Sequence, residues 1–72
     1  MDTYAKLKNM LEEISQKKAE LKKELENEKN PLKRLLKSSA IAYYEDLEIN
    51  LEIRISEIED KLSKLRKKSL QS

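Results

Sequence analysis

The densest group of chemically active side chains is a basic run near the end of the sequence. Cations at this density can bind the phosphates of nucleic acids or lipid head groups, or the carboxylates of an acidic partner. They can also simply complement the dipole of a helix C-terminus. On a helical wheel they do not share one face, so we expect mainly this second role. The run comprises Lys61, Lys64, Arg66, Lys67 and Lys68.

Side chains suited to catalysis or metal binding are scarce. The chain of 72 residues has no His, Cys or Gly. It therefore lacks an imidazole base, a thiolate zinc site, a disulfide and a Gly-rich phosphate loop. Adjacent acids such as Glu12–Glu13 point in different directions on a helix and cannot work as a pair. We therefore expect a protein that is not an enzyme, with no catalytic residue, cofactor or metal site.

The composition indicates long helices. Charged residues make up 42 % of the chain and apolar residues 38 %, yet the net charge is only +2. This mixture, with apolar residues at helical spacing, is typical of coiled coils rather than of disordered chains. No apolar segment is long enough to cross a membrane, and residues 1–4 do not resemble a signal peptide. We expect a cytoplasmic protein without a membrane partner.

Residues 3–28 are predicted to form the first helix. Its apolar residues follow steps of three and four, the heptad pattern of a coiled-coil seam. Lys18 occupies a position in this seam. Either it selects the register of the helices, or its aliphatic stem lies along the seam while its ammonium group reaches water. The other expected seam residues include Leu7, Leu11, Ile14, Leu21 and Leu25.

A turn is predicted at residues 29–30. Asn30 is a favourable N-cap, and Pro31 is favoured at the first position of a helix. A second helix should therefore run over residues 31–68, followed by a frayed tail at 69–72. Because the connection is short, we expect the helices to pack antiparallel as a hairpin, with a kinked rod as the alternative. The fold class is all-α, with the whole chain as one domain.

The second helix carries a main apolar stripe with steps of three and four residues. Residues 47–55 also alternate between apolar and polar types, which is typical of a strand. We favour a helix, because the stripe continues in register on both sides and no second alternating segment offers a partner strand. The residues of this helix expected to face the first helix include Leu36, Tyr43, Tyr44, Leu47, Leu51, Ile55, Ile58 and Leu62.

A second apolar stripe projects from the other side of this helix. It consists of Leu35, Ala42, Ile49 and Ile53. A lone hairpin has little core and would leave this stripe in water. We therefore expect two hairpins to dimerise through it into a four-helix bundle. The function we expect is protein–protein interaction, as a homodimeric adaptor or small chaperone-like module with a further protein partner.

Two other functions remain open. In length and layout the chain resembles the plasmid Rop family of RNA-binding helical hairpins, which implies a nucleic-acid regulator that uses basic helix ends. No motif is shared with that family, so no functional residue carries over. A structural coiled-coil subunit of a larger assembly is the other alternative. The composition would also suit a small accessory protein of a virus or plasmid.

Overall fold

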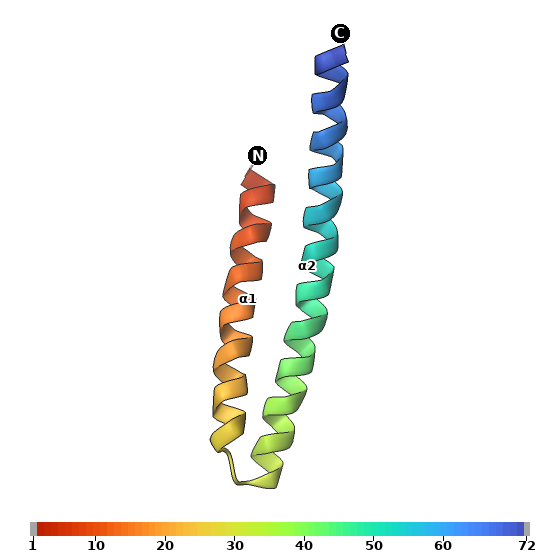
Figure 1. Cartoon of the computed structure of the whole chain (residues 1–72). Helices are drawn as coiled ribbons and strands as arrows, with labels where there is room; N and C mark the ends of the chain where they lie inside the picture. Colours follow the sequence, from red (N-terminus) through yellow and green to blue (C-terminus); the bar gives the residue numbers. More distant parts are fainter. Residues whose placement is uncertain (1, 72) are drawn as a thin grey trace.

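The protein is a hairpin of two long helices (Figure 1). The computed structural model describes residues 2–71, with side chains for residues 3–67. Helix α1 spans Asp2–Asn27 and helix α2 spans Pro31–Gln71. The helices pack against each other in an elongated molecule of 63 × 15 × 15 Å. The all-α hairpin predicted from the sequence is confirmed.

The hydrophobic core is small. Leu7, Leu51 and Ile55 form the buried cluster, and Ile41 is buried nearer the turn. No described side chain is less than 2 % exposed. Two helices can bury only one stripe each against the other, so most of their surface stays in contact with water.

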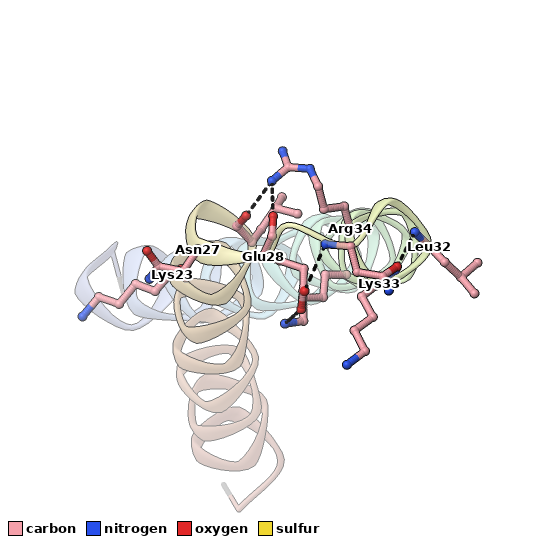
Figure 2. A network of polar contacts seen from close by, with 9 residues as sticks. Lys23, Asn27, Glu28, Leu32, Lys33 and Arg34 are labelled. Atoms are coloured by element: carbon pink, nitrogen blue, oxygen red, sulfur yellow. Dashed lines mark hydrogen bonds and ion pairs between the residues drawn. The ribbon is translucent and has the colours of Figure 1, made fainter.

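The turn is closed by a network of polar contacts (Figure 2). The Asn30 side-chain oxygen accepts hydrogen bonds from the backbone N–H groups of Leu32 and Lys33, at 2.9 and 3.2 Å. Asn30 is thus the N-cap of α2, as the sequence predicts. Arg34 Nη1 donates to the carbonyl oxygens of Leu25 and Glu28, both at 2.9 Å. The same arginine therefore supplies a side-chain donor to two carbonyl groups at the end of α1 and in the turn, where no further helical turn provides donors.

Replacing the cap tests this account of the turn. We expect Asn30→Ala to lower the free energy of unfolding by about 1 kcal/mol, because two N–H groups of α2 lose their acceptor. Chemical denaturation followed by circular dichroism measures the change. Asn27→Ala is the matched control, since the Asn27 amide makes only one long, exposed hydrogen bond of 3.4 Å. Equal losses for the two variants would contradict the capping role.

The helix boundaries differ slightly from the predicted ones. Helix α1 ends one residue before Glu28, whose N–H instead donates to the Leu25 carbonyl at 3.2 Å. Helix α2 continues to Gln71, so residues 69–71 extend the helix rather than forming a frayed tail. Residue 72 lies outside the described residues. Residues 47–55 are helical, and no strand occurs over residues 2–71.

The two helices are unequal in length, with 26 and 41 residues. The Tyr4 hydroxyl donates to Glu59 Oε2 at 2.7 Å, which fixes the start of α1 beside this part of α2. Residues 62–71 therefore extend past the N-terminal end of α1, as Figure 1 shows. We call residues 62–71 the overhang.

Candidate interaction surface

The seam between the helices contains charged residues as well as apolar ones. On α2 most residues with reduced exposure follow alternating steps of four and three, the spacing of a coiled coil, and Ala40 and Leu47 lie next to these positions. Two of these positions are charged, and each charged side chain meets an opposite charge on α1. The seam positions of α2 are Lys37, Ile41, Tyr44, Glu48, Leu51, Ile55, Ile58 and Leu62.

The first ion pair lies midway along α1. Lys18 Nζ is 2.5 Å from Glu48 Oε1, and Ser15 Oγ donates to Glu48 Oε2 at 2.5 Å. The hydrogen bond from Lys18, together with that from Ser15, lowers the pKa of Glu48. The same contact with Glu48 raises the pKa of Lys18. Lys18 therefore has a specific partner across the seam, where its stem stays largely covered.

The second ion pair lies beside the turn, with the opposite polarity. Lys37 Nζ is 2.9 Å from Glu28 Oε1, while Glu28 Oε2 accepts a hydrogen bond from the Asn30 N–H at 3.3 Å. The hydrogen bond from Lys37 is the main reason why the pKa of Glu28 is lowered. Here α1 supplies the acid and α2 the base, whereas in the first pair α1 supplies the base. A shift of one helix along the other would separate both pairs.

These pairs predict how stability depends on pH. A lowered carboxyl pKa contributes stability that is present above the ordinary value of 4.5 and is lost as pH falls through the lowered pKa. The raised pKa of Lys18 acts in the other direction, because its contribution is present below 10.5 and is lost as pH rises through the raised value. We expect the midpoint temperature of thermal unfolding to decrease when the pH is lowered below about 4.5. We also expect it to decrease when the pH is raised above about 10.5.

Thermal unfolding followed by circular dichroism from pH 2 to 12 measures this profile. The double variant Glu28→Gln, Glu48→Gln is the control. It should be less stable at neutral pH and show a shallower acid decline, since its two seam amides do not titrate. Parallel profiles for the two proteins would contradict the role of these carboxylates.

At the N-terminal end of α1, an aromatic side chain bridges the helices. Besides its hydrogen bond to Glu59, the Tyr4 ring lies beneath Lys8 Nζ, 4.9 Å from the ring centroid. The Tyr4 side chain raises the pKa of Lys8. The contact is exposed, so we assign it a positioning role rather than a chemical one.

The structure corrects the predicted seam in the first half of α2. Leu36 and Tyr43 were expected to face α1, but both are 62 % exposed. The seam instead passes through Lys37 and Ile41, because it follows a heptad frame that includes charged residues. The apolar pattern led to the neighbouring stripe and missed Ile41, which is 7 % exposed.

The other predicted seam residues are covered, partly or fully. Leu7, Leu51 and Ile55 are buried in the core. The remainder have intermediate exposure, and they are Leu11, Ile14, Leu21, Leu25, Tyr44, Leu47, Ile58 and Leu62. Tyr44 is at the seam with intermediate exposure, whereas the neighbouring Tyr43 is exposed, and the two rings lie 5.9 Å apart with a tilt of 55°.

A broad apolar surface remains uncovered on α2. It includes all four residues of the predicted second stripe, among them Ile49 and Ile53, which are 54 % and 52 % exposed. Leu36 and Tyr43 extend it toward one side of the hairpin. We call this the outer apolar surface, and it consists of Leu32, Leu35, Leu36, Ala42, Tyr43, Ile49 and Ile53.

A groove adjoins the outer apolar surface between the two helices. Its volume is about 600 Å³, and its apolar lining includes Met10, Ile14 and Leu47. Ile53 belongs both to the groove and to the outer apolar surface. Met10 is 48 % exposed, so α1 also contributes apolar area on this side. Several exposed large apolar side chains next to a groove are typical of an interaction surface.

The predicted basic residues lie around the overhang. Lys61, Lys64, Arg66 and Lys67 are exposed, while the Lys68 side chain lies outside the described residues. Lys64 Nζ lies 3.6 Å from Asp60 Oδ2 on the same helix. Within the described part of the chain, no cluster of acids is arranged to hold a metal ion. Neither described helix is long and apolar enough to cross a membrane.

The chain matches no protein-family model, and no curated protein or solved structure is significantly similar to it. The assignment of function therefore depends on the geometry and chemistry of the hairpin.

Proposed function

We propose that the protein is a protein–protein interaction module that works as a homodimer, joined through the outer apolar surface of α2 into a four-helix bundle. The distribution of apolar residues carries this proposal. Among the side chains that the structure describes, only four large hydrophobic ones are buried, whereas eight are exposed, and seven of those eight lie on α2. Fully burying one such side chain contributes about 1.5–3 kcal/mol, so a partner on this surface would add substantially to a small core.

Charge complementarity favours a second copy as the occupant. Residues 31–44 contain three basic residues and no acid, although Arg34 and Lys37 already contact the end of α1 and Glu28 within the hairpin. Residues 45–60 contain seven acids and only Arg54 as a base. If two α2 helices pair antiparallel, the basic segment of each lies along the acidic segment of the other. Parallel pairing would place like charges side by side. Complementary potentials set orientation in this way.

The apolar residues match in the same antiparallel arrangement. The outer apolar surface runs from Leu32 to Ile53, so its midpoint falls at Ala42 and Tyr43. A two-fold axis at this midpoint would bring Leu32 level with Ile53 of the second copy, and Leu36 level with Ile49. Ala42 near the axis lets the helices approach closely. The surface is therefore complementary to itself, as a two-fold interface requires.

Such a dimer leaves its ends and charged sides free to bind other proteins. The antiparallel arrangement would place the two overhangs at opposite ends of the bundle. Two identical ends give a bivalent molecule, which is the geometry that an adaptor needs. We therefore propose an adaptor role without catalysis.

Solution mass is the first test. Light scattering on the purified chain should give about twice its mass of 8.5 kDa, in low and in high salt. A monomer at micromolar concentration would contradict the proposal.

Cross-linking then tests the orientation, since the chain has no cysteine of its own. Chains with Leu32→Cys should form disulfides with chains carrying Ile53→Cys, and not with themselves. Self-linked Leu32→Cys chains would indicate parallel pairing.

A further inference from the structure

The overhang continues the inter-helix seam into solvent. Ile55 and Ile58 pack against α1, and the same alternating steps reach Leu62 and Leu65. Leu62 is partly covered, but Leu65 is 63 % exposed. None of the described residues of α1 lies alongside Leu65, because Tyr4, near the start of α1, is paired with Glu59, which lies nearly two helical turns before Leu65. The face that binds α1 thus extends past α1.

A small pocket lies where α1 stops covering this face. It is lined by Glu59, Leu62, Ser63 and Arg66 and has a volume of about 290 Å³. An apolar side chain from an incoming helix can enter here beside Leu62. The pocket shows that the uncovered seam has a concave, partly apolar floor beside the exposed Leu65.

Basic residues flank the uncovered seam. Lys61 precedes Leu62 and Arg66 follows Leu65, so they occupy the positions that normally carry the charges beside a coiled-coil seam. Lys64 and Lys67 point toward the other side of the helix. The acids nearby are Glu59, beside Tyr4, and Asp60, beside Lys64. Positive charge therefore dominates around Leu62 and Leu65.

We propose that the overhang binds an acidic amphipathic helix of a partner protein. The partner helix would lie antiparallel to α2, in line with α1. Its apolar residues would cover Leu62 and Leu65, and its flanking carboxylates would pair with Lys61 and Arg66. A second overhang does not fit this site, since it carries charges of the same sign. This site is distinct from the outer apolar surface, so it does not depend on dimerisation.

Nucleic acid fits the overhang less well. Its cations lie on several sides of the helix, so a single phosphate backbone could contact only some of them. Binding phosphates would also leave the exposed leucine seam uncovered. A helical partner uses both the leucines and the charges next to them.

The test uses the full chain and a fluorescently labelled synthetic peptide of three heptads, with Leu at the seam positions and Glu at the flanking positions. Fluorescence anisotropy should show saturable binding, and the same peptide with Lys in place of Glu should bind about tenfold more weakly. Leu65→Glu should weaken binding of the acidic peptide about tenfold. Arg66→Glu should weaken it about threefold. Each of these variants should retain the wild-type circular dichroism spectrum, because both side chains are exposed.

Lys67→Glu is the matched control. Lys67 is the neighbour of Arg66 but lies on the other side of the helix, and its substitution makes the same change of charge. It should alter the affinity for the acidic peptide less than about twofold. Ile49→Glu should also leave peptide binding unchanged, which separates this site from the proposed dimer interface. The proposal is overturned if the acidic peptide shows no saturable binding up to about 1 mM, or if Lys67→Glu and Arg66→Glu weaken its binding equally. It is also overturned if Ile49→Glu weakens peptide binding, or if an equal concentration of short RNA duplex displaces the peptide.

Discussion

The Ile49→Glu variant is expected to be a monomer under conditions in which the wild-type chain is a dimer. Ile49 is 54 % exposed in the hairpin, so a glutamate there meets water and does not disturb the core. In the proposed dimer the same carboxylate would be buried at the interface, level with Leu36 of the second copy, without a partner of opposite charge. Burying an unpaired charge costs several kcal/mol, so the dimer should dissociate at least about a hundredfold more readily.

Ser56→Glu is the matched control for this prediction. Ser56 is exposed, lies two turns after Ile49 on the same side of α2, and is outside the outer apolar surface. It receives the same new charge but should keep the dimer mass. Light scattering gives the mass of each variant, and circular dichroism should show that part of the helix content survives in Ile49→Glu. A dimeric Ile49→Glu protein would refute the proposed interface.

The local signals in the sequence were sufficient to predict the hairpin. Asn30 and Pro31 specify where one helix stops and the next begins, because one caps the new helix and the other suits only its first turn. The alternation at residues 47–55 suggested a strand, but a strand needs a partner and none was available. The helical steps through Leu47, Leu51 and Ile55 were the more reliable signal, as they continued on both sides.

The seam of α2 could be predicted completely only in its second half, whereas Tyr44 is the one seam position of the first half that was predicted. From Leu51 onward the inner positions are apolar, so hydrophobic periodicity finds them. Before Leu51 two inner positions are Lys37 and Glu48, and a search for apolar residues moves to the adjacent stripe of Leu36 and Tyr43. Apolar spacing alone cannot show which of two neighbouring stripes faces the partner helix.

Charge pattern would have resolved this ambiguity. The heptad frame of α1 places Lys18 and Glu28 at inner positions, and an inner charge needs an opposite charge across the seam. The heptad frame of α2 that runs through Lys37 and Glu48 supplies both opposite charges. It places Glu48 as far from the turn as Lys18 is, and Lys37 close to the turn beside Glu28. The contacts of Arg34 with two carbonyl oxygens are different, because they depend on the three-dimensional path of the turn. No pattern in the sequence indicates them.

The two inner ion pairs should specify the register of the hairpin, and charge reversal tests this role. We expect Lys18→Glu alone to lower the midpoint of thermal unfolding by several degrees, because it places two carboxylates together at the seam. Glu48→Lys alone should have a similar effect, by placing two ammonium groups there. The double variant restores an opposite pair and should recover most of the loss, although Ser15 no longer donates to a carboxylate at residue 48.

Lys17→Glu provides the control for the change in net charge. Lys17 is the exposed neighbour of Lys18, so its reversal should shift the midpoint much less. If the double variant were as unstable as the two single losses added together, the pair would have no coupling and could not specify register. Recovery in the double variant would mean that the charged positions select one alignment of the helices. The same alignment determines which apolar residues remain outside the seam, and therefore the composition of the outer apolar surface.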